Sequence, residues 1–374
     1  MDKRQFLQTV LLGCGGIICL RNPVSAFVPS EEASAFGKKW MREAQFYTTT
    51  PRGIRCLICP NECNIKEGEA GDCRNRINKD GKLYSIAYGN PCAIHIDPIE
   101  KKPLLHFLPG STAFSIATAG CNLACLNCQN WAISQKSPKE TQNYDLMPDK
   151  VVEQCKKNGC KSVAYTYSEP ITFYEYTYDT SVLARQEGIK SVVISAGYIN
   201  HDPLVKLCKV VDAIKIDLKS FSDEIYMKLN AGKLQPILDT LVTIKNEGVW
   251  LEIVNLVVPS WTDNPDMIKR MCNWLVNNGF EQTPLHFSRF MPMYKLTQLP
   301  PTPVNTLKNA REIALGEGLK YVYIGNIPGY DFENTFCPKC KNLVVERRGY
   351  SILQNHIAGG KCMFCGAVIK GVWE

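Results

Sequence analysis

The residues of this chain with the most distinctive chemistry are three cysteines in the segment AGCNLACLNCQNWAIS, residues 119–134. Cys121, Cys125 and Cys128 have the spacing C-x3-C-x2-C, and the segment contains no fourth cysteine. A site that a protein closes alone around one metal ion usually has four ligands. A four-iron cluster held by three thiolates keeps one iron open, and a small molecule with an amine and a carboxylate can chelate it. The alternative interpretation is a zinc site or an unliganded loop of cysteines.

The stretch GCNLACLNC resembles the cluster motif of the radical S-adenosylmethionine (SAM) enzymes. The resemblance implies a [4Fe-4S] cluster on the three cysteines, with SAM as the ligand of the open iron. In that family, reductive cleavage of SAM forms a 5′-deoxyadenosyl radical, which abstracts hydrogen from a substrate. The family commonly has an aromatic residue before the third cysteine, where this chain has Asn127. Adenine packing is therefore expected from the backbone or from Trp131.

Repeated βα units are expected around this segment, because short β-branched runs alternate with helical patterns that often end in glycine. Such units form an α/β barrel or an open part of one, with the chemistry at the carboxyl ends of the strands. The resemblance narrows this to a partial (β/α)6 TIM-like barrel. The predicted strands are 113–120, 162–167, 190–196, 213–218, 250–258 and 284–290, with 321–326 as a seventh, and the predicted helices are 148–159, 171–188, 201–211, 264–279 and 302–318.

Two further loops match SAM-binding segments of the same family. Tyr-Ser-Glu-Pro at 167–170 resembles its Gly-Gly-Glu segment, which implies that Glu169 accepts the protons of the SAM amino group. A carboxylate suits an ammonium-like donor in a dry site. Ser195 corresponds to a contact with the SAM carboxylate or ribose, and Gly197 allows close approach of the backbone. The alternative for Glu169 is an exposed residue at a helix start.

Polar residues at the ends of two later strands complete the expected site. Asp217 and Lys219, in IDLK, resemble the Asp-Leu-Lys segment of glycyl-radical-enzyme activases, where they lie near the SAM sulfonium. Lys219 is accordingly predicted to be catalytic, and a structural ion pair is the alternative. His286 and Arg289 correspond to positions that face the ribose in relatives, although a strand histidine can equally be part of the core.

Two groups of four cysteines flank the predicted barrel. The C-terminal quartet forms two C-x2-C pairs separated by 21 residues, a spacing typical of a zinc ribbon, with iron or disulfides as alternatives. The N-terminal quartet lies in CLICPNECNIKEGEAGDC and is predicted to hold zinc or an auxiliary iron–sulfur cluster. The N-terminal quartet is Cys56, Cys59, Cys63 and Cys73, and the C-terminal quartet is Cys337, Cys340, Cys362 and Cys365.

The resemblance extends over roughly residues 50–374. DPIEKKPLLHFLPGS, CQNWAIS, HFSRFMPMYK and YVYIGN are similar to segments of AmmeMemoRadiSam-system radical SAM proteins, relatives of the pyruvate formate-lyase activating enzymes. The expected function is radical SAM chemistry on an unidentified substrate, with an electron donor of flavodoxin or ferredoxin type. The alternatives are an activase that installs a glycyl radical on a protein substrate, and a non-enzymatic metal-stabilised binding or electron-transfer protein.

Composition limits the partners and the compartment. The net charge of +7 comes from 43 basic and 36 acidic residues without long runs of one sign, so an ordinary solvated surface and no specific nucleic-acid partner are expected. Ten of the 18 cysteines fall into C-x2-C or C-x3-C clusters, which favours metals and a reducing compartment over disulfides. Five single cysteines, Cys92, Cys155, Cys160, Cys208 and Cys272, are predicted to be small buried hydrophobes.

The first residues have the pattern of a signal peptide, with a basic start, an apolar run from Val10 to Leu20 and a small-residue exit. KRQFLQ resembles a twin-arginine export motif with Lys3 at its first arginine, so the chain is expected to be either cytoplasmic or exported after folding. The apolar run is too short for a transmembrane span. The predicted division is 1–28 signal peptide or tail, 50–111 cysteine-rich region, 112–330 radical SAM barrel and 331–374 zinc-ribbon-like segment.

Overall fold

The computed structural model of the chain describes residues 37–327 and 331–374. The predicted signal peptide or tail at 1–28 lies outside the described residues, so the export hypothesis stays a prediction. Within the described ranges, no helix combines the length and the apolar character needed to cross a bilayer.

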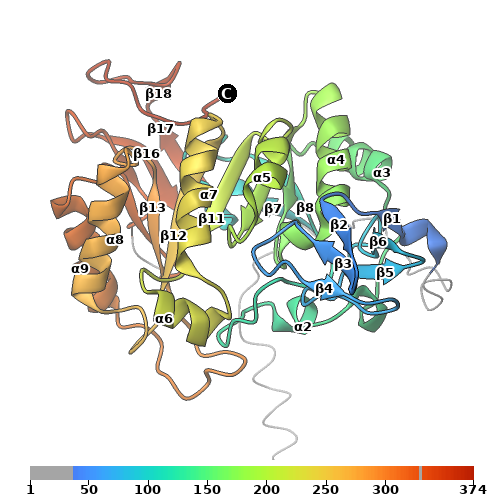
Figure 1. The fold of residues 1–374 in the computed structure, drawn as a ribbon. Helices are drawn as coiled ribbons and strands as arrows, with labels where there is room; N and C mark the ends of the chain where they lie inside the picture. The colour runs from blue at the N-terminus through green and yellow to red at the C-terminus, as the bar shows by residue number, and fades with distance from the viewer. Residues whose placement is uncertain (1–36, 328–330) are drawn as a thin grey trace, which may run out of the picture.

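A mainly parallel sheet of eight strands forms the centre of the molecule, in the order β14-β13-β12-β11-β10-β9-β8-β7 (Figure 1). Strands β8 to β14 are mutually parallel, and β7 pairs antiparallel with β8. The predicted α/β class and all seven predicted strands are thus confirmed. The bounds are β7 Ala93–Pro98, β8 Thr112–Ala117, β9 Ser162–Tyr165, β10 Lys190–Ser195, β11 Ala213–Asp217, β12 Trp250–Val257, β13 Leu285–Arg289 and β14 Val322–Gly325.

The parallel strands are buried along most of their length, as expected for a sheet that other elements cover on both faces. Helices between the strands supply part of this cover, and each buries a stripe of apolar residues. In α8 that stripe is Met267, Ile268, Met271, Cys272 and Leu275. The long helices are α3 Pro148–Lys157, α4 Tyr174–Gln186, α5 His201–Cys208, α7 Leu234–Asn246, α8 Pro265–Asn277 and α9 Val304–Gly316.

Single helical turns occupy several of the loops. Two of them, α2 within the three-cysteine segment and η7 against it, are described with the site below. The short elements are η3 Lys38–Trp40, η4 Ile99–Lys101, α2 Trp131–Ser134, η5 Pro138–Glu140, η6 Pro170–Phe173, α6 Asp223–Ile225 and the π-helical η7 Tyr226–Asn230.

The N-terminal region forms two small antiparallel sheets, β1-β6-β5 and β2-β3-β4, near the β7 side of the central sheet (Figure 1). A fully buried ion pair joins them to α4, since Arg76 Nη2 lies 2.5 Å from Glu175 Oε1. The backbone N–H of Gln45 donates to the same oxygen at 2.8 Å. The bounds are β1 Arg42–Glu43, β2 Tyr47–Thr50, β3 Gly53–Cys56, β4 Asn64–Ile65, β5 Arg76–Lys79 and β6 Lys82–Ser85.

The C-terminal segment forms a three-stranded and a two-stranded sheet near the other end of the central sheet (Figure 1). Arg347 docks it, because its buried guanidinium donates to the carbonyl oxygen of Leu105 at 2.7 Å. The same guanidinium donates to the Glu333 carbonyl within the segment, also at 2.7 Å. The bounds are β15 Thr335–Phe336, β16 Leu343–Arg348, β17 Ser351–Asn355, β18 Ile357–Ala358 and β19 Lys361–Cys362.

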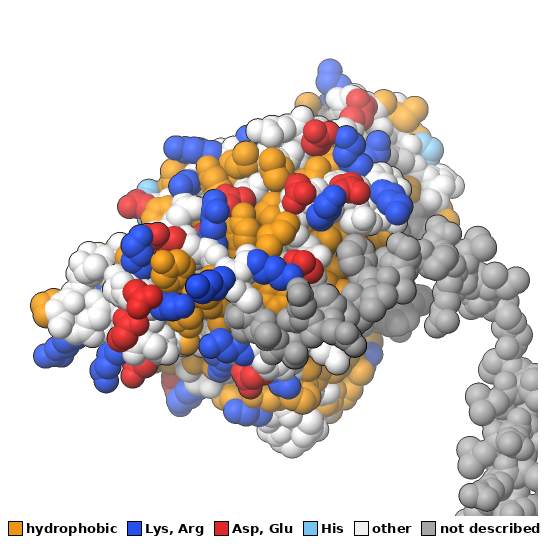
Figure 2. Space-filling view, turned by 90° about the vertical axis from the view of Figure 1, so that its right-hand side faces the viewer, with side chains coloured by type: hydrophobic (Ala, Val, Ile, Leu, Met, Phe, Trp, Pro, Cys, Tyr) orange, Lys and Arg blue, Asp and Glu red, His pale blue; other side chains and the backbone are white. Residues whose placement is uncertain are grey.

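Charged side chains of both signs alternate with hydrophobic ones over the face drawn in Figure 2. This mixture is what the scattered charges of the sequence predict for an ordinary solvated surface.

Candidate functional site

The three-cysteine loop, residues 119–134, runs from the carboxyl end of β8 through α2. A polar neighbour contacts each sulfur atom. The backbone N–H of Leu123 donates to Cys121 Sγ at 3.4 Å, and Asn230 Nδ2 donates to Cys125 Sγ at 3.2 Å. Cys128 Sγ lies 3.1 Å from Ser134 Oγ. These contacts suit sulfur atoms that carry negative charge.

Backbone contacts hold this loop against η7, at the end of the segment that follows β11. The N–H of Ala124 donates to the Asn230 carbonyl at 3.0 Å, and the N–H of Leu126 donates to the Leu229 carbonyl at 2.9 Å. Gly120 starts the loop with φ +98°, and a Cβ there would lie 2.5 Å from the Cys73 carbonyl oxygen. Only glycine fits this position, both for its backbone angle and for its space.

The donor set of the loop fits a multi-iron cluster better than one ion. Within residues 37–327 and 331–374, the only group of three or more cysteine, histidine or carboxylate ligand atoms that all lie within 4.8 Å of one another is the C-terminal quartet. The sulfurs of the three-cysteine loop are thus not gathered as ligands of a single ion would be. Burial raises the pKa of the Cys121 and Cys125 thiols, and Lys219 and Asn230 oppose this shift at Cys125.

Glu169 and Ser195, both predicted from the sequence, form a direct hydrogen bond with each other. Ser195 Oγ donates to Glu169 Oε1 at 2.7 Å, and the N–H of Ala196 donates to Glu169 Oε2 at 2.8 Å. The N–H of Ile171 donates to Oε1 at 3.2 Å. Burial raises the pKa of this carboxyl, although these hydrogen bonds oppose the shift. Gly197 N–H donates to Ser195 Oγ at 2.9 Å, which fixes the hydroxyl.

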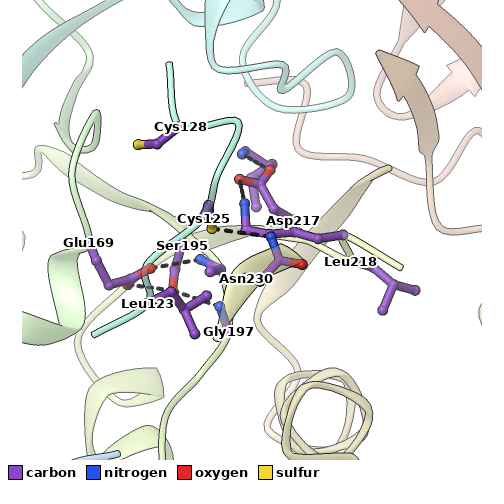
Figure 3. A network of polar contacts seen from close by, with 12 residues as sticks. Leu123, Cys125, Cys128, Glu169, Ser195, Gly197, Asp217, Leu218 and Asn230 are labelled. Carbon is purple, nitrogen blue, oxygen red and sulfur yellow. Dashed lines mark hydrogen bonds and ion pairs between the residues drawn. The ribbon is translucent and has the colours of Figure 1, made fainter. Parts of the chain in front are cut away.

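Asp217 ends β11 and lies on the other side of Cys125 from Glu169 and Ser195 (Figure 3), and Lys219 follows it two residues later. Lys219 Nζ is 3.2 Å from Asp217 Oδ2, and Lys215 pairs with Asp217 Oδ1. Burial would raise the pKa of Asp217, but the two lysines lower it to about 2. Burial would lower the pKa of Lys219, but Asp217 and the Cys125 thiolate raise it. Both side chains of the pair are therefore charged at neutral pH.

His286 is not brought together with these residues. It lies near the amino end of β13 with 3% of its surface exposed, and its Nε2 is 2.7 Å from Glu252 Oε2. Its ring stacks on Tyr323 with centroids 5.1 Å apart. Arg289 lies at the carboxyl end of the same strand, where its Nε donates to the Thr302 carbonyl at 2.9 Å. Contacts of either residue with a ribose stay a prediction.

Trp131, at the start of α2, is 43% exposed and stacks on Tyr294 with ring centroids 5.3 Å apart. The two rings differ in plane by 12° and come from distant parts of the chain. The sequence predicts that Trp131 or the backbone packs on the adenine, because Asn127 stands where the family commonly has an aromatic residue. That role of Trp131 stays a prediction.

The C-terminal quartet is a compact set that could bind a metal. Its four sulfurs lie within 4.8 Å of one another, with Cys337 Sγ 3.6 Å from Cys365 Sγ and Cys340 Sγ 3.7 Å from Cys362 Sγ. The members of the N-terminal quartet instead line one small cavity, together with isoleucine, asparagine and threonine side chains and Arg76. All cysteines of the described residues are free of disulfides.

Sequence reasoning did not identify two polar residues of these sites. Asn230 contacts Cys125, and Arg76 lines the N-terminal cavity, and both are fully buried. Neither belongs to a motif with its ligands, since Asn230 is 105 residues from Cys125 in the sequence. No sequence signal announces such contacts, because they depend on the packing of separate loops.

Comparison with known proteins shows a similarity to one superfamily. The model of the radical SAM superfamily matches residues 115–275, which include the three-cysteine loop, Glu169 and Asp217. The chain is 47% identical over 332 residues to the uncharacterized protein MJ0808 of Methanocaldococcus jannaschii, which covers 88% of this chain and 99% of that protein.

More distant relatives include the pyruvate formate-lyase 1-activating enzyme of Escherichia coli, 27% identical over 220 residues, or 54% of this chain and 89% of that enzyme. A crystal structure of a radical SAM methyltransferase from Sphaerobacter thermophilus aligns with a TM-score of 0.46 and 13% identity, over 59% of this chain and 67% of that one. Residues 115–275, which carry the three-cysteine loop, are thus similar to the radical SAM superfamily, whose model they match.

Proposed function

We propose that this chain is an enzyme whose three-cysteine loop holds a [4Fe-4S] cluster and whose barrel mouth binds SAM. When bound, the cluster and SAM supply reductive cleavage to methionine and a 5′-deoxyadenosyl radical, which abstracts hydrogen from a substrate. One observation carries the proposal: three cysteines, the Glu169–Ser195 pair and the Asp217–Lys219 pair come from the carboxyl ends of neighbouring parallel strands. That edge is where α/β barrels perform their chemistry.

The residues of the chain have separate roles in this proposal. Glu169 accepts hydrogen bonds from the SAM amino group. Three protein groups that already donate to the carboxylate hold it in one orientation before SAM binds. Such preorganisation lowers the entropy lost on binding. Lys219 places a positive charge near Cys125, which offsets the negative charge of a thiolate-bound cluster. Gly197 and Arg289 are proposed as further contacts of the nucleoside, whereas the buried His286, near the amino end of β13, is not.

A second candidate is an activase that acts on a protein partner. The similarity to the pyruvate formate-lyase 1-activating enzyme favours it, because that similarity covers most of the enzyme's length. In both candidates the cluster must be reduced by one electron, and we propose an electron donor of flavodoxin or ferredoxin type. Membership of the AmmeMemoRadiSam-system proteins is proposed from the motifs DPIEKKPLLHFLPGS and HFSRFMPMYK.

For the C-terminal quartet we propose zinc in a ribbon-like segment. Four thiolates around one zinc ion at about 2.3 Å place neighbouring sulfurs about 3.8 Å apart in a regular tetrahedron. The sulfur separations of 3.6 and 3.7 Å agree with this arrangement. The backbone N–H groups of Lys341 and Gly366 donate to the carbonyls of Cys337 and Cys362, which closes a tight turn at each cysteine pair.

The experiment that tests the enzyme proposal is anaerobic reconstitution with iron and sulfide, reduction with dithionite and chromatographic detection of 5′-deoxyadenosine. We expect slow formation of this product by the isolated chain and none in the Cys121→Ala, Cys125→Ala, Cys128→Ala triple variant. Cys92→Ala, at a single cysteine outside the three groups, is the matched control and should keep activity. A reduced, iron-loaded protein that neither binds nor cleaves SAM would instead favour a metal-stabilised scaffold.

The two enzyme candidates are separated by the source of the abstracted hydrogen. A small-molecule substrate labelled with deuterium should transfer the label into 5′-deoxyadenosine, whereas an activase should leave a glycyl radical on its protein partner. Electron paramagnetic resonance of the partner after reaction distinguishes these outcomes.

A further inference from the structure

The N-terminal quartet surrounds a small cavity that the radical SAM chemistry proposed above does not use. Cys56, Cys59 and Cys73 are buried and Cys63 is half-buried, and all four line this one cavity. We propose that the N-terminal quartet holds a second iron–sulfur cluster, packed against the backbone of the three-cysteine loop, and not a zinc ion.

The spacing of the sulfurs is the first argument, and the C-terminal quartet provides the internal comparison. The same chain brings the four C-terminal sulfurs within 4.8 Å of one another, as one tetrahedral ion requires. In the part of the chain that the structure describes, no three sulfurs of the N-terminal quartet meet that limit. Thiolates that each bind a different iron of a cluster must stand farther apart than thiolates that share one ion. The wider arrangement around a cavity is therefore the one that a cluster needs.

Arg76 is the second argument, because it is a buried donor beside the cavity. Its side chain has no exposed surface and lines the cavity together with the cysteines. Only its Nη2 is engaged, with Glu175 and with the Gln45 carbonyl at 2.9 Å. Its Nε and Nη1 have no hydrogen-bond partner among residues 37–327 and 331–374. An unpaired buried donor is costly, and the negatively charged sulfurs of a cluster would accept from it.

The third argument is the contact between this site and the three-cysteine loop. Asn122, which follows Cys121, lines the cavity, and its carbonyl accepts a hydrogen bond from Asn61 Nδ2 at 3.0 Å. Asn75 Nδ2 donates to the Ala119 carbonyl at 2.6 Å. A redox-active centre in this cavity would thus be the immediate neighbour of the first cluster. A zinc ion there would only stabilise the fold.

The test uses the full chain with Cys121, Cys125 and Cys128 replaced by alanine, so that the first site cannot contribute iron. After anaerobic reconstitution with iron and sulfide, iron, sulfide and zinc are measured by elemental analysis, and Mössbauer spectra are recorded. We expect about four irons and four sulfides per chain to remain, as a cubane cluster requires. Adding Cys56→Ser and Cys59→Ser should remove them, whereas adding Cys92→Ala should not. A reconstituted triple variant that contains two zinc ions and no iron would overturn the proposal.

A second measurement covers the case in which the serine variants fail to fold. Replacing both members of the buried ion pair, Arg76→Met with Glu175→Gln, keeps every thiolate and leaves no unpaired charge behind. We expect the iron to stay bound and the midpoint potential of the second cluster to become more negative, because the lost positive charge of Arg76 lines the cavity whereas the lost negative charge of Glu175 does not. An unchanged potential would contradict the contact between Arg76 and the cluster. These readouts do not depend on SAM, so they can fail while SAM cleavage succeeds, and the reverse.

Discussion

Replacing Glu169 by glutamine keeps the shape of the side chain but removes its charge and one acceptor oxygen. Only 2% of Glu169 is exposed, and both of its carboxylate oxygens accept hydrogen bonds. An amide NH2 at the Oε2 position would face the N–H of Ala196, and at the Oε1 position it would face the N–H of Ile171. One buried backbone donor loses its partner in either orientation. The expected loss in the free energy of unfolding is about 1–3 kcal/mol.

The same substitution should weaken SAM binding by a separate mechanism. A hydrogen bond to a charged group contributes about 1.5–3 kcal/mol, which the neutral amide would largely lose with the SAM amino group. This corresponds to a dissociation constant about 10- to 150-fold higher. Iron content should not change, because Glu169 is not a ligand of the cluster.

The assay is equilibrium binding of labelled SAM to the anaerobically reconstituted protein, combined with iron analysis and urea unfolding. Glu153→Gln is the matched control, since Glu153 is 57% exposed and pairs only with Lys150 within the described chain. It should alter neither affinity nor stability. Unchanged SAM affinity in Glu169→Gln would refute the assigned role. Loss of iron would show that Glu169 stabilises the three-cysteine loop and does not bind SAM.

Three further predictions concern the first cluster, the pH dependence and the C-terminal metal. Asn230→Ala removes the N–H donor to Cys125 Sγ, so the midpoint potential of the first cluster should become more negative in a redox titration. Because burial raises the pKa of Glu169, SAM affinity should rise with pH through that pKa, and Glu169→Gln should lose this dependence. In the protein without SAM, the free energy of unfolding depends on pH in the opposite direction. The contribution of Glu169 to it is present below pH 4.5 and is lost as pH rises through the raised pKa of this carboxyl. Chelation of one zinc per chain should speed hydrogen exchange in residues 331–374 and leave the central sheet unchanged.

Each of these has a clear contrary result. An unchanged potential in Asn230→Ala would mean that the sulfur contact has no electronic effect. A pH profile retained in Glu169→Gln would assign the titration to another group. Unchanged exchange after metal removal would show that the C-terminal segment folds without its metal.

The central sheet could be predicted from sequence because its parallel strands are buried runs of β-branched residues separated by helical patterns. β7 was not predicted, since only one of its residues is fully buried and it belongs to a region assigned to the cysteine-rich part. α7 was also missed. Its sequence LQPILDTLVTIKN has Pro236 in the first turn, where a proline is tolerated although it reads as a helix breaker. Local patterns therefore identified the buried parallel strands, but they missed one edge strand and one of the long helices.

The cysteine ligands were predictable from spacing, but their surroundings were not. The role of Arg347 could not be predicted, because its buried guanidinium donates hydrogen bonds to the carbonyls of Leu105 and Glu333. The partnership of Glu252 with His286 likewise depends on the register of two adjacent strands. Such pairs join residues far apart in the sequence, and no local pattern encodes them.

The most direct test of the central claim is electron paramagnetic resonance of the dithionite-reduced, reconstituted chain before and after addition of SAM. A three-cysteine cluster with an open iron should change its signal when SAM binds, because the amine and carboxylate enter the coordination shell of that iron. The change should be absent in the Cys121→Ala, Cys125→Ala, Cys128→Ala variant. A cluster signal that SAM leaves unaltered in the unmodified chain would contradict the claim that the three-cysteine loop binds this cofactor.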